Sequence, residues 1–541
     1  MAESQGHAAP VTADLCWMSA SELARAIRRG EVSAREAVAA HIRRIEAVNP
    51  ALNAVVVPLF EEALAAADAA DAARAAGAEL GPLHGVPVTI KDQFAVAGTP
   101  ATWGLPSRAR TISRADGPLV ARLRRAGAII LGKTNVPQLL AYNESVNPLY
   151  GRTKNPWNPL RTPGGSSGGE ASIVAAGGSS LGLGADLGGS LRLPAHFCGL
   201  AALKCTSERL TNLDSPPELY GWGQEAVAMQ PGPLARTVED VALALRVLAA
   251  PGLAEVDPAV APVAWREAAE VRVEGLRIAL YVDDGVFPAA PAVRRVVREA
   301  AEALRARGLV VEEWTPPDVF YAMRLFARLI AGYSGSYTRK LVAHNRRDPR
   351  IASFLRVVGI PNAVRPAIGA LLRASGQSNL ADFVLNLRPF SADQYLEFVA
   401  ERARYRDRFV AEMDTRRFDA IICPPHALPA LTHEGSTYLM GAGSYSFLYN
   451  LLGMPAGVVP ASRVRPGEES DRVVHRDIVE RAAARVERAS AGLPVGVQVA
   501  ARHWREDVAL AVMGVLEEHF RQGPLYPARP VIEAGAGRAG A

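Results

Sequence analysis

Hydrophobic and polar positions in the first 150 residues alternate between helical and strand-like spacing. Apolar residues recur at helical spacing in three stretches, and two shorter runs are almost continuously apolar. The expected helices cover residues 19–48 (two helices, with Ser19 and Ser33 as N-caps), 59–76 and 118–125. The expected strands cover 83–90, which ends at Lys91, and 128–131. This alternation of helices and short apolar strands predicts an α/β layer fold.

The same alternation continues to the C-terminus around one long helical stretch. Further helices are expected within 232–249, 291–307, 468–491 and 508–519, and strands at 276–282, 309–313, 418–423 and 493–500. Residues 318–408 are rich in arginine and aliphatic side chains, and we interpret them as a helical insertion carried on the core. We therefore predict one domain over 1–541, with N-terminal helices at 1–80, the main core at 81–317, a helical cap insertion at 318–408, core completion at 409–525 and a disordered tail at 526–541.

Composition and charge exclude several classes of protein. Apolar residues make up 49% of the chain and charged residues 21%, which is typical of a folded globular protein. The net charge of +5 comes from basic residues mixed with acids, and no basic stripe with interleaved aromatics indicates nucleic-acid binding. Four scattered cysteines, none in Cys-x-x-Cys spacing, predict buried thiols in a reducing compartment and no metal site.

The N-terminus carries no targeting signal that the sequence reveals. Residues 1–14 lack the basic start and apolar run of a secretory signal. No segment has the roughly 18 uninterrupted apolar residues of a transmembrane helix. We therefore expect a cytoplasmic protein.

Two serine clusters lie in the glycine-rich stretch 150–199. Gly-Gly-Ser-Ser-Gly-Gly occupies 164–169, and Asp-Leu-Gly-Gly-Ser occupies 186–190. Flexible loops or phosphate cradles are the alternatives, but no Gly-Lys-Ser/Thr follows, as a P-loop requires, and the glycine spacing does not fit a dinucleotide fingerprint. A serine hydrolase needs a nucleophile, a base and oxyanion donors, and serine-glycine turns of this kind suit the first and the last.

The base is the part that the sequence leaves hardest to find. Of the ten histidines, His84 and His196 lie nearest these motifs. Neither belongs to a recognisable triad pattern, and we expect both to be structural. Lysine is the remaining candidate, and Lys91 follows a buried-looking strand where a charge would be poorly solvated.

The motifs resemble those of the amidase-signature family. The blocks that carry the resemblance are 83–92, 164–169, 184–192, 197–199, 232–237 and 455–460. Ser190 follows Ser166 by 24 residues, which is the family's interval between its proton-shuttle serine and its nucleophile. The likeness extends from about Ser19 to about Phe520. It implies a large mixed β-sheet surrounded by α-helices, with a helical cap.

The resemblance also assigns roles to residues. It makes Ser190 the nucleophile, Ser166 the proton shuttle and Lys91 the base, with no metal or organic cofactor. It places the backbone N–H groups of Leu187, Gly188, Gly189 and Ser190 around the oxyanion, with Leu140 and Ser166 in contact with the substrate. It further implies a cis peptide bond between Gly165 and Ser166.

Within this family the chain is most similar to the fatty acid amide hydrolase branch. The blocks 220–227, 387–391, 444–450 and 492–498 carry that likeness. It implies hydrolysis of fatty acid amides or N-acyl amines through an acyl-enzyme. The alternatives are a broad-range aryl or aliphatic amidase, the amidase subunit of a tRNA-dependent amidotransferase, and a catalytically inactive binding protein. Ala141, small where the mammalian branch tends to be aromatic, leaves the exact amide open.

The segment 360–387 mixes aliphatic residues with arginine, as interfacial helices do. We expect it to cap the substrate entrance and to make peripheral membrane contact, as the similar branch does. The alternative is an ordinary amphipathic helix packed on the core or at a homodimer interface. The partners implied are a small-molecule amide substrate, this membrane contact and a second copy of the chain, with no nucleic acid.

Overall fold

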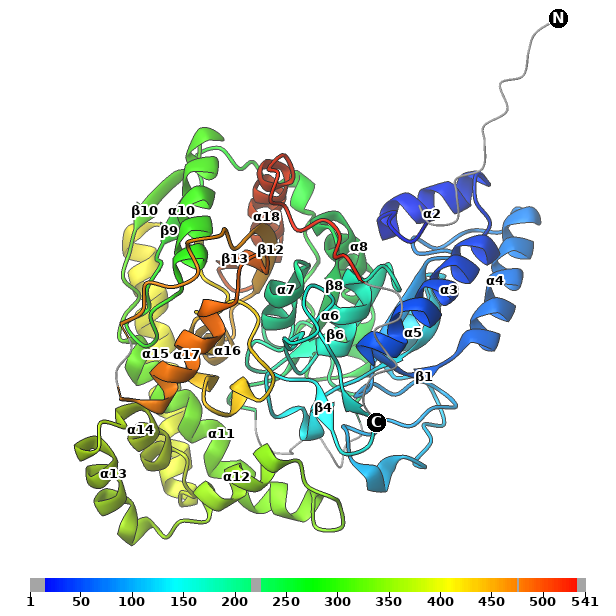
Figure 1. Cartoon of the computed structure of the whole chain (residues 1–541). Coiled ribbons are helices and arrows are strands. Elements are labelled where there is room, and N and C mark those ends of the chain that lie inside the picture. The colour runs from blue at the N-terminus through cyan, green and yellow to red at the C-terminus, as the bar shows by residue number, and fades with distance from the viewer. Residues whose placement is uncertain (1–14, 216–224, 474–475, 533–541) are drawn as a thin grey trace, which may run out of the picture.

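The computed structural model describes residues 15–215, 225–473 and 476–532 (Figure 1). Within these ranges eleven strands form one mixed sheet in the order β1-β3-β2-β6-β8-β7-β12-β13-β11-β9-β10. The strands are β1 (Val55–Pro58), β2 (Pro87–Lys91), β3 (Ile129–Thr134), β6 (Leu181–Asp186), β7 (Ala201–Lys204), β8 (Gln230–Ala235), β9 (Arg277–Leu280), β10 (Val310–Glu313), β11 (Ala420–Cys423), β12 (Ala456–Arg463) and β13 (Pro494–Ala501), besides a small ribbon of β4 (Val146–Asn147) and β5 (Gly151–Arg152). The predicted fold class, a large mixed sheet surrounded by helices, is confirmed.

Helices surround this sheet in layers. They are α2 (Ala20–Arg29), α3 (Ala34–Leu52), α4 (Phe60–Ala75), α5 (Pro118–Arg125), α6 (Gly168–Ala175), α7 (Arg192–Cys198), α8 (Val238–Leu248), α9 (Leu253–Val256), α10 (Pro291–Ala306), α11 (Val319–Leu341), α12 (Pro349–Val358), α13 (Arg365–Ala374), α14 (Ser378–Asn386), α15 (Ala392–Arg416), α16 (Ser444–Leu452), α17 (Ile478–Arg488) and α18 (Glu506–Arg521). Side chains of β3 alternate between two apolar cores: Ile129 and Leu131 pack with α3 and α6, and Ile130 packs with α5 and α8. Because both faces are covered, the strands are almost continuously apolar.

Some predicted features lie partly or wholly outside the described residues. These are the N-terminal segment 1–14, residues 220–224 of the branch motif, residues 474–475 of the helix expected at 468–491, and residues 533–541 of the expected tail. The described part of that tail, residues 526–532, lies against the core: Tyr526 and Ile532 pack on apolar side chains.

The sequence signals for helix ends are confirmed in the N-terminal region. α2 and α3 begin after Ser19 and Ser33, and each serine forms a capping box with the glutamate at the third helical position. α4 is followed by Gly77, whose φ of 71° is the left-handed conformation that favours glycine.

The stretch 318–408 is helical, as predicted, and its helices differ in how they pack. α11 and α15 pack against each other and against α16, whereas α13 and α14 pack on each other at the edge of the molecule (Figure 1). The buried guanidinium of Arg365 donates to carbonyl oxygens that close α12 and α14, namely those of Val357, Val358, Ile360, Val384 and Leu387. Among the described helices none is alone long and apolar enough to cross a membrane; α12 and Asn362–Ala374, which meet at a bend of 82°, reach that length and composition only together.

Candidate active site

Lys91 is the last residue of β2, a strand that is buried along its whole length. β2 runs parallel to β3 on one side and to β6 on the other, so the Lys91 side chain is enclosed and fully buried. Its Nζ donates a hydrogen bond to Oγ of Ser166 at 2.8 Å and a longer one to the carbonyl oxygen of Ala185 at 3.4 Å. The structure thus brings two of the residues predicted to be catalytic into direct contact.

Burial controls the protonation of Lys91. Removal from water lowers the pKa of this lysine from 10.5 to about 7, although the charges of Asp186, Glu170 and Asp92 act in the opposite direction. A lysine with that pKa is about half neutral near pH 7. Lys91 can therefore accept a proton under conditions where an ordinary lysine is almost entirely charged.

Ser166 lies in a crowded backbone segment. The Gly165–Ser166 peptide bond is cis, as the resemblance implied. A Cβ at Gly165 would lie 2.3 Å from the carbonyl oxygen of Tyr142 and 2.7 Å from the amide nitrogen of Glu144, so only glycine fits there without displacing the backbone. The segment that carries Ser166 is therefore held against residues 142–144.

Ser167 links the two serine motifs. Its backbone N–H donates to the carbonyl oxygen of Ser190 at 3.2 Å. Its Oγ donates to the carbonyl oxygen of Ala185 at 3.2 Å and accepts from the N–H of the same residue at 3.3 Å. Ser190 therefore lies beside the Ser166 segment, and contact between the two hydroxyl groups stays a prediction.

The turn at 187–190 presents free backbone donors. No acceptor among the described residues takes the N–H of Leu187, Gly188 or Ser190. The N–H of Gly189, whose φ is 84°, is instead donated to Oδ1 of Asp186 at 2.7 Å. Three of the four predicted oxyanion donors thus make no hydrogen bond among the described residues, and the fourth is already bonded to a carboxylate.

Sequence analysis missed the polar network that shapes this turn. Asp186 and Arg192 form a fully buried ion pair at 2.9 Å. Arg192 also donates to Oε1 of Gln498 at 2.8 Å and to Oδ1 of Asn450 at 2.6 Å. Burial alone would raise the pKa of Asp186, but the charge and hydrogen bonds of Arg192 hold it well below its usual range. The carboxylate therefore stays charged, and its hydrogen bonds fix the backbone that carries Ser190.

Leu140 lies apart from these polar groups. It ends a short 3₁₀ turn (Gln138–Leu140), and both it and Leu139 have a φ of 57°. Both leucines pack against an apolar cluster of Trp103, Leu105, Val342, Ile351 and Leu355. Leu140 therefore connects the core to α12, and its contact with substrate stays a prediction.

The two histidines nearest the motifs are bonded to backbone groups. Nε2 of His84 lies 3.0 Å from the carbonyl oxygen of Ala70. Nδ1 of His196 accepts the N–H of Gly496 at 3.0 Å, and burial lowers the pKa of this imidazole to about 3. Their contacts agree with the expected structural roles. Among the described residues, no group of three or more His, Cys, Asp or Glu side chains could hold a metal ion.

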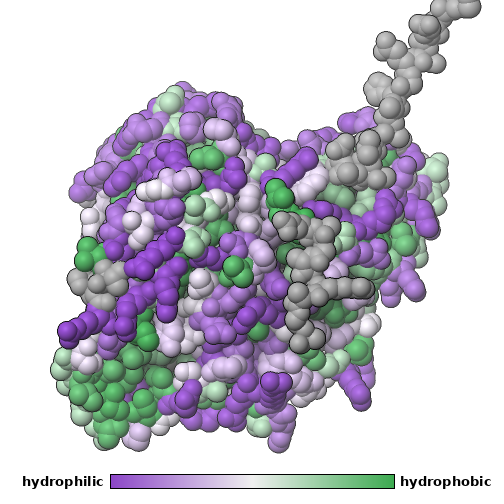
Figure 2. Space-filling view, viewed as in Figure 1, coloured by the Kyte–Doolittle hydropathy of each residue, from purple (hydrophilic) through white to green (hydrophobic). Residues whose placement is uncertain are grey.

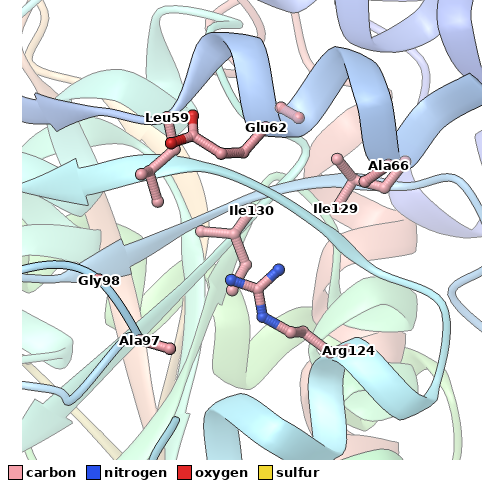
Figure 3. Close-up of a pocket in the computed structure, with 9 residues that line it drawn as sticks. Leu59, Glu62, Ala66, Ala97, Gly98, Arg124, Ile129 and Ile130 are labelled. Carbon is pink, nitrogen blue, oxygen red and sulfur yellow. The ribbon is translucent and has the colours of Figure 1, made fainter. Parts of the chain in front are cut away.

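A small cavity of about 90 Å³ lies elsewhere, between α4, α5 and β3 (Figure 3). Leu59 and Ile130 form part of its apolar lining, and Glu62 of α4 and Arg124 of α5 supply charged groups from opposite sides. It is near the start of β3, whereas Lys91 pairs with Thr134 at the end of that strand. The cavity contains none of the predicted catalytic residues, so we do not assign the chemistry to it.

Comparison with known proteins agrees with this geometry. A model of the amidase family matches residues 36–510. Fatty-acid amide hydrolase 1 of Sus scrofa is 33% identical over 516 residues, covering 93% of this chain and 86% of the relative. Indoleacetamide hydrolase of Bradyrhizobium diazoefficiens is 43% identical over 304 residues, which cover 56% of this chain and 57% of that protein.

Solved structures give the same result for the fold. A fatty acid amide hydrolase superposes with a TM-score of 0.83 at 26% identity, covering 94% of this chain and 86% of the other. A bacterial aryl acylamidase superposes with a TM-score of 0.72 at 25% identity, covering 95% of this chain and 99% of the other. With a family model matched over most of its length and relatives above 30% identity along it, this chain belongs to the amidase family of amide-hydrolysing enzymes.

Proposed function

We propose that this amidase works through an acyl-enzyme on Ser190, with Ser166 as the proton shuttle and Lys91 as the base. The observation that carries the proposal is the 2.8 Å hydrogen bond between the fully buried Lys91 Nζ and Ser166 Oγ. A lysine pKa of about 7 supports the role, because a general base works best when its pKa is near the operating pH.

The proposed reaction is a proton relay coupled to nucleophilic attack. Neutral Lys91 accepts the hydroxyl proton of Ser166, which accepts that of Ser190 as Ser190 Oγ bonds to the amide carbon. The carbonyl electron pair moves to oxygen, and the free N–H groups of the 187–190 turn stabilise the oxyanion. Collapse breaks the C–N bond, and the proton returns through Ser166 to the leaving nitrogen. Water, deprotonated by the same relay, then hydrolyses the ester and releases the acid.

Fatty acid amides and N-acyl amines are the substrate class that we propose. The relatives named fatty-acid amide hydrolase cover almost the whole chain. An apolar wall also stands beside the proposed oxyanion site: Phe326 of α11 and Phe447 of α16 stack with centroids 4.9 Å apart. A Cβ at Gly188 would lie 3.3 Å from Phe326, so this wall reaches the turn itself. Such a surface suits an apolar acyl chain next to the reacting carbonyl.

Hydrolysis of a series of saturated primary amides, from acetyl to arachidoyl, tests this substrate class. We expect kcat/KM to rise with chain length, by up to about fourfold for each methylene that becomes buried, until the site is filled. Ammonia release is the measurement, and Ser190→Ala is the blank. Turnover by the purified chain alone would exclude an obligatory amidotransferase subunit. A rate that does not depend on chain length would contradict the lipid-amide class.

A broad-range aryl or aliphatic amidase is the second candidate. The shorter matches favour it, since an indoleacetamide hydrolase at 43% identity and an acylamidase at 39% each align over 56% of this chain. Aryl amides cleaved faster than any member of the acyl series would select this candidate over the first.

We also propose peripheral membrane contact through α13 and α14. Figure 2 shows apolar surface gathered over the corner of the molecule where these helices lie in Figure 1. Leu371 is 71% exposed and Val364 just before α13 is 46% exposed, which is unusual for large apolar side chains. Arg373 on the same helix is paired with Asp382 of α14 at 2.7 Å, so the exposed aliphatic side chains carry this proposal.

Val364→Asp with Leu371→Asp is expected to reduce co-sedimentation with phosphatidylglycerol-containing liposomes by at least about tenfold, because two exposed apolar side chains that would insert into the lipid are replaced by charges. Turnover of a short soluble amide should not change. Leu160→Asp, at a side chain that is 75% exposed outside the cap, is the matched control. Wild-type protein that ignores liposomes would refute the contact, and a double variant that loses only a dimer would assign the surface to a second copy.

A further inference from the structure

The loop 138–145 lies between Ser166 and the cap. Its inner side touches the backbone that carries the shuttle serine, as the short distances from Gly165 to Tyr142 and Glu144 show. Ser145 adds two hydrogen bonds on this side: its backbone N–H and its Oγ both donate to the carbonyl oxygen of Gly164 at 3.1 Å. A shift of this loop would therefore move the Gly164–Ser166 backbone with it.

The outer side of the loop is held by a buried ion pair. Glu144 is 1% exposed, and its Oε2 accepts from Nη1 of Arg350 at 3.0 Å. The same carboxylate accepts the N–H groups of Glu434 and Ser436 at 2.8 and 2.9 Å and the hydroxyl of Ser436 at 2.8 Å. Arg350, at the start of α12, is 8% exposed and is held from its other side by Asp348 at 2.7 Å. Every polar atom of the Glu144 carboxylate is thus satisfied inside the protein.

Two further contacts join the start of α12 to the same loop. The N–H of Asp348 donates to Oε1 of Gln138 at 2.8 Å, and the hydroxyl of Tyr142 donates to the carbonyl oxygen of Arg350 at 2.8 Å. The apolar cluster around Leu140 packs Ile351 of α12 on the loop as well. Helix and loop therefore form one packed unit with an ion pair at its centre.

Breaking such a pair costs free energy mainly because the partner that remains is still charged and buried. Removing Arg350 leaves the buried Glu144 carboxylate without a positive partner, and removing the Glu144 charge leaves Arg350 paired with Asp348 alone; either change destabilises the local structure. The loop would have to move so that water could reach the Glu144 carboxylate. Because the loop contacts the Ser166 backbone directly, that movement would disturb the hydrogen bond between Ser166 and Lys91.

We propose that Glu144 and Arg350 are positioning residues for catalysis: their ion pair clamps loop 138–145 between α12 of the cap and Gly164–Ser166, and so aligns the Ser166 hydroxyl with Lys91. This inference rests on the proposed role of Ser166 as proton shuttle. Glu144 and Arg350 touch neither substrate nor reacting atoms in it. They act only through the backbone that carries the serine.

Steady-state kinetics on a short soluble amide test this role. Glu144→Gln and Arg350→Met are each expected to lower kcat by on the order of 10²-fold, because small displacements of a catalytic group have effects of this size. KM should change by less than about threefold, since the interaction acts on the relay and not on substrate binding. The double variant should be no slower than the slower single variant, because both changes remove one interaction. Arg350→Lys, which keeps the charge, should recover part of the loss.

The matched control is Arg472→Met. It removes an ion pair with Glu487 whose partners are 6% and 1% exposed, so its burial matches that of the Arg350–Glu144 pair, but it lies outside the loop. Its kcat should equal that of the wild type. An equal loss in this control, or a loss that appears in KM with kcat unchanged, would overturn the positioning role. If Arg350→Met does not fold, the comparison of Arg350→Lys with Glu144→Gln decides the question by the same criteria.

Fluorophosphonate labelling separates this inference from the proposed function. Wild-type protein that is not labelled at Ser190 would overturn the proposed mechanism, and the inference with it. Wild-type protein that is labelled and active, beside Glu144→Gln and Arg350→Met variants that keep wild-type kcat, would overturn the positioning role alone. Labelling that slows in both variants in parallel with kcat supports it.

Discussion

Replacing Ser190 with alanine is expected to lower kcat by on the order of 10⁶-fold and to leave the fold intact. The proposed mechanism has no second nucleophile, because the other hydroxyl at the centre, that of Ser166, is hydrogen-bonded to Lys91. The backbone of residue 190 keeps its bond from the Ser167 N–H, since that bond uses the carbonyl oxygen. Loss of one buried hydroxyl should therefore change the free energy of unfolding by no more than about 1 kcal/mol. Ammonia release and a thermal melt of the variant measure the two effects.

The covalent adduct identifies the nucleophile independently of rates. A slowly released carbamate should add its acyl mass to the peptide that contains Ser190. Ser167→Ala is the matched control, because its side chain bonds only to the backbone of Ala185 among the described residues. This variant should still be labelled at Ser190. An adduct on Ser166 or Ser167 would show that the roles of the two motifs are exchanged.

The contact between Lys91 and Ser166 joins residues 75 positions apart in the chain, and the family resemblance still predicted it. Both residues lie in short segments whose type and order are distinctive: an apolar strand that ends in Lys-Asp, and a Gly-Gly-Ser-Ser-Gly-Gly turn. The expected strand over 83–90 is β2, which begins four residues later than expected, at Pro87, and ends one residue later, at Lys91. Local sequence determines such segments, and the family resemblance supplied the pairing between them.

The network around Asp186 could not be predicted in the same way. Its partners Asn450 and Gln498 lie 264 and 312 residues further along the chain, and nothing in their spacing indicates that they meet at one guanidinium. The available signal was that all of them fall inside blocks that resembled the family. Those blocks indicate which residues belong to the family pattern, and they do not indicate which of these residues are in contact.

Strand β8 was missed for a different reason. Its sequence Gln-Pro-Gly-Pro-Leu-Ala contains two prolines, and proline is normally confined to edge strands because it cannot donate to the ladder. The strand nevertheless lies between β6 and β7 in the interior of the sheet. A Cβ at Gly232 would lie 2.4 Å from the carbonyl oxygen of Leu203, so close packing with β7 accounts for the glycine.

The helix expected at 468–491 was too long. α17 covers only Ile478–Arg488. Upstream of it, Glu468 binds Arg295 of α10 at 2.7 Å, and Arg472 binds Glu487 at 2.9 Å. Charged residues that looked like the solvated face of one helix instead hold an extended segment against its neighbours.

Replacing Lys91 with alanine or methionine is expected to lower kcat/KM by several orders of magnitude near pH 7, on the order of 10³-fold or more, because no other base among the described residues is hydrogen-bonded to the Ser166 hydroxyl. The pH profile should change as well as the rate. In the wild type, activity needs the neutral amine, so kcat/KM should fall below a pH of about 7 and level off above it. In the variants hydroxide must remove the proton, so the residual rate should climb by about tenfold per pH unit without a plateau.

Stability provides a test of the lysine's pKa that does not involve catalysis. The folded protein holds the pKa of Lys91 at about 7, below the 10.5 of an exposed lysine, so between these values the unfolded chain binds more protons. The contribution of Lys91 to the free energy of unfolding therefore rises with pH across this window, and below it the full destabilisation, about 5 kcal/mol, is present. Lys91→Met lacks a titrating group there. Its melting temperature relative to the wild type should consequently increase as the pH falls from about 10 to about 7.

Lys133→Met is the matched control for both measurements. Lys133 is also fully buried, on the neighbouring strand β3, and burial lowers its pKa to about 8. Its Nζ donates to the carbonyl oxygen of Pro100 and to no serine among the described residues. The melting temperature of Lys133→Met relative to the wild type should therefore also increase as the pH falls from about 10.5 to about 8. Its pH–rate profile should be that of the wild type. If Lys133→Met moves the acid limb of that profile and Lys91→Met leaves it in place, Lys91 is not the base.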